Sequence, residues 1–595
     1  MHTMAAASIC PRFPYGSIFQ DALPNIYSNN RVLDVALTYQ SVFDQYNNSL
    51  YCYMLPDGIH QSPTLRMDPG DTLHFTLTNL YNPVDSNSSL INSTHYALCG
   101  SDTMTASSTN VHFHGIHSPP KCHDDYAMAT IINYGDTFTY AIDVPLDQPP
   151  GLYWYHPHVF PLAEIAVQGG ATGVFIVNGI ENVKPELSGL EERILVFRDT
   201  AVESDELANT TYPGYDLSLN YIPIKYPDYT TPNLPIRPSA KQFWRIANTA
   251  ADTILNLTLT YDNIGQRFEV VGLDGTPTTT NLLLSHLYLM PGQRAEVIVT
   301  APALSVKNAV LAASLFDMGP VGEIYPARPL LLLEPRADAP LSSTIVPAAA
   351  VSAPPASLQM PPATEVQAIL ALTPAKRRLI IFTEILSDPS DPASLTFFFV
   401  TEDGHKPVYY DMKNLPAIIA QQGTVEDWVL QNRATETHVF HIHQMHFLVL
   451  NSVKPVDNGA FRDVVEVPYW TGNLADPYPN VTVRLDFTRK EVVGDFVYHC
   501  HILSHEDFGM MAGIRVVAAG TSSQSSSSSS ADAKVDRDLV LKIVLPIGIA
   551  LCICVLVLVS FLACSYLPRK TKTSATVHDQ RSPDLEINSS FSLKV

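Results

Sequence analysis

Positive charge is scarce in this sequence. Its 595 residues hold 36 Lys and Arg against 58 Asp and Glu, which gives a formal net charge of −22 at pH 7. Such a charge repels phosphate backbones and argues against nucleic-acid binding. It suits a secreted or surface protein, a protein that meets cationic ligands, or plain solubility. The length exceeds one hydrophobic core, so we expect several domains.

The opening residues, MHTMAAASICPRFPYGS, lack the basic start and the apolar core of a secretory leader. Near the other end, Ile543 to Leu567 runs without a charge, is long enough to cross a bilayer as a helix, and is followed by basic residues. We therefore expect a transmembrane helix within 539–567, a cytoplasmic tail at 568–595, and a single-pass type I protein whose body is extracellular or lumenal. This topology needs a leader upstream. The alternative is insertion by the C-terminal span alone, with the body in the cytosol.

Few cysteines are free to form disulfides. Of the eight, three belong to the expected span, and Cys500 belongs to a motif described below. Cys10, Cys52, Cys99 and Cys122 remain as partners in an oxidising compartment, with a connectivity that the sequence does not reveal. Glycosylation sequons, which suit the same exterior, lie at Asn47, Asn87, Asn92, Asn209, Asn256 and Asn480.

Long amphipathic helix patterns are rare, and period-two alternation takes their place. LHFTLTNL from Leu73, ILNLTLTY from Ile254 and VTVRLDF from Val481 alternate apolar and polar residues, which indicates half-buried strands. The predicted fold class is therefore all-β, built from sandwiches or barrels. Composition and pattern divide the chain into an N-terminal segment (1–30), β-domains at 31–180, 181–337 and 366–519, an Ala/Pro-rich linker (338–365) and a Ser-rich stalk (520–538).

Four pairs of histidines are spaced by one residue, although 20 His in 595 positions would give roughly 0.7 such pairs by chance. On a strand both histidines of a pair point to the same face. Pairs from the first and third β-domains would thus bring eight imidazoles to a shared interface, and only metal binding needs so many at this spacing. The pairs are His112/His114, His156/His158, His441/His443 and His499/His501.

Cys500 lies between two of these histidines, so on a strand it must face a second metal site. One thiolate, two histidines and a weak axial methionine are the ligands of a blue-copper electron-transfer site. His505 and Met510 follow closely enough to bind the same ion, and His438 can supply the second imidazole from a neighbouring strand. The backbone around Cys500 would then join the two metal sites by a short covalent route. Zinc, the alternative metal, normally closes a compact Cys/His site that this pattern does not match.

In these motifs the sequence resembles the multicopper oxidases, a family that includes laccases, ascorbate oxidases, bilirubin oxidases and ferroxidases. HFHG, WYHPH, HVFHIH and HCHILSHEDFGM occur in the family's order, and the resemblance spans Val32 to Ala519. It implies three cupredoxin-like Greek-key β-sandwich domains and four copper ions as cofactors. It also implies a small-molecule reductant and dioxygen as partners: a type 1 copper takes single electrons from the reductant, and a trinuclear cluster passes four to dioxygen, which becomes water.

The resemblance also assigns ligands by motif position. His112 and His441 match the type 2 ligands, and His505 matches the more exposed type 1 ligand, the expected entry point for electrons. The type 1 copper would take His438, Cys500, His505 and, more weakly, Met510. The type 3 pair would be held by His114, His156, His158, His443, His499 and His501.

Reduction of dioxygen to water also consumes four protons, so carboxylates are expected near the trinuclear cluster. Asp125 and Glu506 fall where acidic residues of relatives act near the dioxygen path; the alternative is that each is an ordinary hydrogen-bonded or exposed acid. Met510 should lower the type 1 potential relative to members with Leu or Phe at this position. HILSHEDFGMM resembles bacterial spore-coat and bilirubin-oxidase-like members and ascorbate oxidases more than fungal laccases and iron oxidases, which weakens a ferroxidase assignment without excluding it.

These features predict a membrane-anchored, laccase-like oxidase of phenolic or similar small reductants. A second hypothesis is oxidation of Fe(II) or another low-valent metal ion, with a metal permease as partner. It needs carboxylates around His505, and the membrane anchor favours it because fungal surface ferroxidases have a similar span. A third, a non-catalytic surface protein on the same scaffold, is disfavoured because no ligand position is missing. The 13 Met are dispersed, without the Met-rich insertion expected for a dedicated cuprous oxidase.

Overall fold

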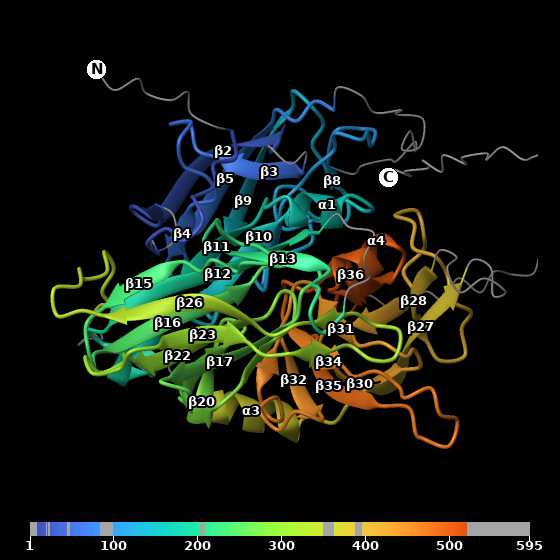
Figure 1. Cartoon of the computed structure of the whole chain (residues 1–595). Helices are drawn as coiled ribbons and strands as arrows, with labels where there is room; N and C mark the ends of the chain where they lie inside the picture. Colours follow the sequence, from blue (N-terminus) through green and yellow to red (C-terminus); the bar gives the residue numbers. More distant parts are fainter. Residues whose placement is uncertain are drawn as a thin grey trace, which may run out of the picture. The chain divides into compact units, whose positions relative to one another are not determined.

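The computed structural model describes residues 9–19, 21, 24–44, 48–83, 99–202, 209–348, 362–386 and 396–520. In these ranges the fold is mostly β, and three pairs of large sheets follow one another along the chain (Figure 1). We call each pair a sandwich, because each encloses an apolar cluster. The helices are short: α1 (Ala163–Gln168), α2 (Ile180–Val183), η2 (Pro185–Leu187), α3 (Pro362–Ala371) and α4 (Leu503–Asp507).

The first sandwich has an aromatic core. Every second residue of its strand β5 is buried, as the alternation in LHFTLTNL predicts. Tyr53 and Phe75 from one sheet meet Phe113 and Tyr155 from the other. One sheet has the order β1 (Asn25–Tyr27), β4 (Thr64–Met67), β11 (Gly173–Val177), β10 (Gly151–His156) and β7 (His112–His114). The other has β3 (Ser49–Met54), β2 (Val32–Phe43), β5 (Thr72–Asn79) and β9 (Thr137–Asp143), and a two-stranded sheet joins β6 (Cys99–Gly100) to β8 (Thr130–Ile131).

The second sandwich contains none of the four histidine pairs. Its strand β17 carries the ILNLTLTY alternation, with Leu255, Leu257 and Leu259 buried in the core. One sheet has the order β14 (Ile222–Ile224), β13 (Tyr215–Leu219), β12 (Glu191–Ala201), β16 (Lys241–Asn248), β22 (Arg294–Thr300), β19 (Phe268–Leu273) and β20 (Thr276–Leu284). The other has β15 (Asn233–Ile236), β26 (Arg328–Pro335), β23 (Ala309–Ala313), β17 (Leu255–Tyr261) and β18 (Ile264–Gly265), with β21 (Leu287–Leu289) paired to β17 and a separate hairpin of β24 (Phe316–Asp317) and β25 (Ile324–Tyr325).

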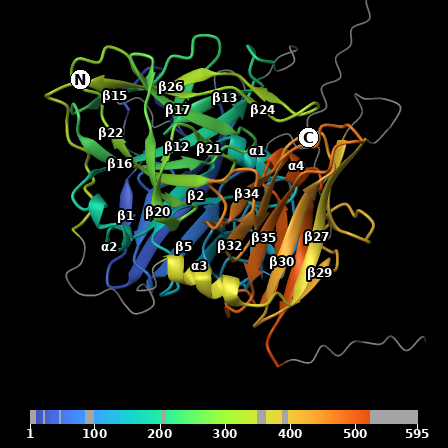
Figure 2. The same cartoon turned by 90° about the horizontal axis from the view of Figure 1, so that it is seen from below.

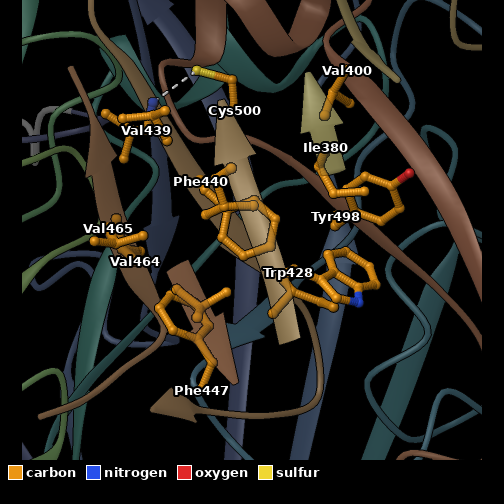
Figure 3. Packing of buried hydrophobic residues seen from close by; sticks show 14 of the residues in the cluster. Ile380, Val400, Trp428, Val439, Phe440, Phe447, Val464, Val465, Tyr498 and Cys500 are labelled. Carbon is orange, nitrogen blue, oxygen red and sulfur yellow. Dashed lines mark hydrogen bonds between the residues drawn. The ribbon is translucent and has the colours of Figure 1, made fainter. Parts of the chain in front are cut away.

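The third sandwich packs Trp428, Phe440, Phe447 and Tyr498 in one core with Cys500 (Figure 3). The cysteine therefore enters an apolar, water-free environment. One sheet has the order β28 (Thr396–Glu402), β27 (Lys376–Leu386), β30 (Val425–Asn432), β35 (Asn480–Asp486), β32 (Phe447–Asn451) and β33 (Phe461–Arg462). The other has β29 (Ile418–Gln421), β37 (Met511–Val517), β36 (Gly494–Cys500), β31 (His438–Ile442) and β34 (Val464–Val467).

The Ala/Pro-rich linker is less extended than expected. Its first part joins the second sandwich, where Glu192 N donates to Thr344 O and Val346 N donates to Leu190 O. Helix α3 already begins at Pro362, because PATEVQAILA combines Pro in the first turn with good helix formers. Its Val366 packs near Leu448 of β32, and the helix runs beside β20 (Figure 2). Residues 349–361 lie outside the described ranges.

Two disulfides supply the connectivity that the sequence left open: Cys10–Cys52 and Cys99–Cys122. Among the described residues Cys500 alone is a free cysteine.

The prediction of a glycosylation site is wrong for one sequon, that of Asn256. The Asn256 side chain is only 6% exposed, with Oδ1 2.9 Å from His286 Nδ1, so it cannot accept a glycan without unfolding its surroundings. Asn209 is exposed and Asn480 half-buried. The other three sequons lie outside the described ranges, at Asn47, Asn87 and Asn92.

In the part of the chain that the structure describes, no helix is both long and apolar enough to span a membrane. The expected span at Ile543–Leu567, the stalk beyond Gly520 and the tail lie outside the described residues.

Candidate metal centres

Two neighbouring strands of the first sandwich carry its histidine pairs. β7 and β10 are antiparallel, and their register sets His112 opposite His156. His114 lies two residues along β7, on the same face as His112. His158 follows β10, and its backbone N–H donates to Asn110 Oδ1 at 2.7 Å. Residues some forty positions apart thus meet at one end of the sheet.

The third sandwich presents its pairs in the same way. β31 and β36 are antiparallel neighbours with His441 opposite His499 and Phe440 opposite Cys500. Because side chains alternate along a strand, His499 leaves on one face while Cys500 enters the core on the other. His438 lies three residues before His441 and therefore shares the face of Cys500.

All eight paired histidines converge between the first and third sandwiches, and none is more than 3% exposed. We call them the histidine cluster. The Nε2 atoms of His158, His443 and His499 lie 3.1–3.3 Å from one another. Three nitrogens about 2.0 Å from one metal ion stand at most about 3.5 Å apart, so this triad fits a single ion. The remaining members are His112, His114, His156, His441 and His501.

The other five Nε2 atoms are buried and have no hydrogen-bond partner among the described residues. Several of the opposite ring nitrogens are anchored: His112 Nδ1 on Asp125, His156 Nδ1 on Pro157 O and His441 Nδ1 on Asp463 O. An anchored Nδ1–H fixes the tautomer and leaves the Nε2 lone pair for a metal. The donor set therefore fits the copper ions that the sequence predicts for it.

Burial also favours the neutral form of six of these rings. Desolvation, followed by repulsion between neighbouring imidazoles, holds the pKa of most cluster histidines well below the ordinary value, and lowers the pKa of His158 to about 4. Neutral imidazole is the metal-binding form. The histidines with strongly lowered pKa values are His114, His156, His441, His443 and His501.

Two glycines and one stacked tryptophan pack closely around the histidine cluster. Gly115 has φ +89°, and a Cβ there would collide with Asp463 and Tyr153. A Cβ on Gly292 would press on the His501 ring at 3.1 Å. Trp154, the residue before the WYHPH tyrosine, stacks on His156 with ring centroids 4.1 Å apart. The glycine of HFHG is thus required by its positive φ and by close packing against Asp463 and Tyr153, which lie beside the cluster.

His438, Cys500, His505 and Met510 form a second centre, which we call the cysteine cluster. The Nδ1 atoms of His438 and His505 are 3.1 Å apart and lie 3.9 and 3.7 Å from Cys500 Sγ. These three donors surround one point, and Met510 is buried in the same core. Val439 N–H donates to Sγ at 3.3 Å (Figure 3). Burial raises the pKa of the Cys500 thiol, so its thiolate form needs the charge of a bound metal.

Both predicted shuttle carboxylates contact the histidine cluster. Asp125 Oδ2 lies 3.0 Å from His112 Nδ1, and its Oδ1 accepts the Phe113 N–H. Glu506 lies with Oε2 3.0 Å from His499 Nδ1 and Oε1 3.6 Å from His158 Nδ1. Burial acts to raise the pKa of Glu506, but its contacts with His158 and His499 outweigh burial and lower that pKa to about 2.

Sequence reasoning missed a group of carboxylates beside the cysteine cluster. Glu436 Oε1 lies 3.1 Å from His505 Nε2, and Glu384 Oε1 lies 3.3 Å from His438 Nε2. Burial, then the charges of Glu384 and Glu323, raise the pKa of Glu436 to about 9. The position of Glu436, two residues before His438, was the one available indication. Glu384 and Glu323 come from distant segments.

Sequence reasoning also missed an ion pair behind the histidine cluster. Asp463 binds Arg294 through two hydrogen bonds of 2.7 Å, and both side chains are fully buried. The Asp463 carboxylate also approaches His114 Nε2 at 3.4 Å. No local pattern pointed to either residue.

Comparison with known proteins agrees with this geometry. Family models described as multicopper oxidase match residues 103–182, 201–323 and 387–519, together more than half of the chain. A laccase of Bacillus subtilis (strain 168) is 24% identical over 433 residues, which cover 68% of this chain and 78% of the laccase. Multicopper oxidase LPR2 of Arabidopsis thaliana is 24% identical over 465 residues, which cover 69% and 75%.

The fold has solved counterparts as well. A multicopper oxidase from Campylobacter jejuni, described as a metallo-oxidase, aligns with a TM-score of 0.58 at 22% identity, covering 85% of this chain and 96% of that one. This confirms the cupredoxin-like β fold. With the three family matches, it shows that the chain is a laccase-like oxidoreductase of the multicopper oxidase family, which uses one type 1 copper, one type 2 copper and a type 3 pair.

Proposed function

We propose that the chain oxidises a low-valent metal ion, Fe(II) foremost, at the cysteine cluster and delivers the electrons to dioxygen at the histidine cluster. The observation that carries this is the pair of carboxylates, Glu436 and Glu384, placed 3.1 and 3.3 Å from the outward Nε2 atoms of His505 and His438. The sequence alone favoured phenols because Met510 weakens a ferroxidase assignment and because carboxylates at His505 could not be placed from it. Their presence reverses the order of the two hypotheses.

The proposed ligand assignment follows the two clusters. His438, Cys500 and His505, with Met510 as weak axial ligand, hold the type 1 copper, and His112 and His441 hold the type 2 copper. The type 3 pair is held by His114, His156, His158, His443, His499 and His501. When bound, the coppers accept one electron at a time and pass four to dioxygen, which takes up four protons and leaves as two waters.

The carboxylates give the site its preference for a cation. Glu384 and Glu436 offer carboxylate oxygens within 4.8 Å of each other and of a His438 ring nitrogen. Crowded carboxyls repel each other when ionised, and a divalent cation between them removes that repulsion. Carboxylate oxygen suits Fe(II) better than it suits a neutral phenol. The Glu436 carboxylate against His505 Nε2 would hold the ion one side chain away from the type 1 copper.

The two remaining acids, Asp125 and Glu506, contact the histidine cluster and have different roles. Asp125 fixes the His112 ring through Nδ1 and holds that ligand in place. Glu506 lies between His158 and His499 and is the group best placed to carry protons toward the cluster. Each Fe(II) that becomes Fe(III) gives one electron, so four turnovers of the metal site match one dioxygen.

The test is steady-state oxygen consumption with Fe(II) and with 2,6-dimethoxyphenol, over autoxidation controls. Glu384→Gln and Glu436→Gln should each raise the KM for Fe(II) at least tenfold and change phenol oxidation less than threefold. The matched control is Asp338→Asn, a surface carboxylate paired with Arg336. Wild-type enzyme that turns over the phenol rapidly and Fe(II) poorly would overturn the proposal in favour of a phenol oxidase like the laccase relatives.

We further propose a type I membrane-anchored enzyme with its body outside the cytosol, alongside a permease that takes up the oxidised metal ion. The disulfides Cys10–Cys52 and Cys99–Cys122 support an oxidising compartment. Protease treatment of intact cells tests the topology: removal of the body while a C-terminal tag stays protected is the expected result.

A further inference from the structure

Copper ions cannot reach the histidine cluster directly from solvent in this fold. Every ligand of the histidine cluster is at most 3% exposed, so an ion must cross protein to reach it. A cavity of about 10 Å³ lies beside His158, between the first and third sandwiches. One water-sized sphere needs roughly this volume, which is ample for a bare metal ion. The cavity is lined by Ala127, Met128, Ile131, His158, Val159, Phe160, Tyr410, Met412 and Met511.

Three of the nine lining residues are methionines. Met128 and Met412 are half-buried, so they stand between solvent and the interior, while Met511 is buried. Met412 also packs against a neighbouring buried cluster that contains Met104. These methionines are far apart in the sequence, and the sandwich interface gathers them at a cavity that is also lined by His158.

We propose that Met128, Met412 and Met511 form an entry path on which cuprous ions pass from solvent to His158 and so load the histidine cluster. Thioether sulfur is a soft ligand that selects Cu(I) over harder cations. Aliphatic side chains would suffice for an apolar wall, so three thioethers beside one imidazole favour copper over a purely space-filling role.

The transfer is a ligand exchange without a redox step. A thioether leaves the ion, the Nε2 lone pair of His158 replaces it, and copper stays cuprous. No proton is released, because a neutral imidazole keeps its proton on Nδ1. His443 and His499 then complete the site, since their Nε2 atoms lie 3.1 and 3.3 Å from that of His158. This path concerns loading of the copper cofactor and is independent of the reductant that the enzyme oxidises.

The experiment follows copper uptake by the full-length apoprotein, given tetrakis(acetonitrile)copper(I) under anaerobic conditions. The test variant is Met128→Leu/Met412→Leu/Met511→Leu, because Leu replaces Met with little change of volume. The matched control, Met54→Leu/Met67→Leu/Met290→Leu, removes three buried methionines that do not line this cavity. Copper per chain and the type 2 EPR signal after exposure to air report the histidine cluster, and the blue colour reports the cysteine cluster.

The test variant should fill the histidine cluster at least tenfold more slowly, with the rate of blue colour unchanged and the same final copper content. X-ray absorption of Cys500→Ser protein whose histidine cluster already holds its copper should, after one further equivalent of Cu(I), show sulfur neighbours that the three Leu substitutions remove. Loading at the wild-type rate, or copper with nitrogen neighbours alone, would overturn the proposal. If the Leu variant loads normally while Met412→Trp raises the KM for dioxygen, the cavity admits dioxygen and not copper.

Discussion

Replacement of Glu506 by Gln should slow reoxidation of the reduced enzyme by dioxygen at least a hundredfold. Glu506 is fully buried, with Oε2 3.0 Å from His499 Nδ1 and Oε1 3.6 Å from His158 Nδ1. Gln has the same shape and keeps an oxygen acceptor for His499, but its amide cannot carry a proton.

The substitution has two effects of different size. Exchange of a charge-assisted hydrogen bond for a neutral one costs about 1 kcal/mol, which is about fivefold in copper affinity. Loss of a positioned proton carrier costs about 10²- to 10⁴-fold in rate. The kinetic loss therefore exceeds the loss of copper by more than tenfold, and the two can be measured separately on copper-replete protein.

Stopped-flow absorption of the blue band separates the half-reactions. Anaerobic bleaching by the reductant reports electron entry at the cysteine cluster and should match wild type. Return of the band after mixing with dioxygen should be slow in Glu506→Gln and partly restored in Glu506→Asp. A Gln variant that holds four coppers and reoxidises within fivefold of wild type would refute this role for Glu506, as would a slow rate fully explained by missing copper.

Cys500→Ser should abolish the blue colour and the oxidase activity while the type 2 EPR signal remains, because only the thiolate site loses a ligand. Asp463→Ala should lower the free energy of unfolding by about 3–5 kcal/mol in urea titrations, because it leaves the buried charge of Arg294 unpaired. Burial, opposed by Arg245, raises the pKa of Glu296 from 4.5 to about 7. Between these two values Glu296 is therefore protonated in the folded state and ionised in the unfolded state. The free energy of unfolding should fall by about 3 kcal/mol as pH rises through that interval. Glu296→Gln should flatten the decline, and an unchanged pH slope would contradict it.

Local pattern was sufficient for strands that build the cores of the three sandwiches. LHFTLTNL, ILNLTLTY and VTVRLDF each lie in a strand, because alternation with period two buries one face whatever the partner strand is. The same period explains why Cys500 and His499 leave β36 on opposite faces. A prediction that depends on a residue's spatial neighbours could fail. The glycosylation site predicted at Asn256 is wrong, because contacts with β21 and its surroundings bury the side chain.

The sequence by itself determined the metal chemistry of this protein. Four histidine pairs around one cysteine specify imidazole and thiolate donors at strand spacing, and spacing alone sets which of them share a face. The tertiary structure decided the rest. Glu384, Glu436 and Glu323 reach the cysteine cluster from separate segments, and Met128, Met412 and Met511 meet beside His158 only because the first and third sandwiches pack together. Such groups have no periodic relation along the chain, so their proximity follows from packing, and the proposed preference for a metal ion and the proposed path for copper both depend on it.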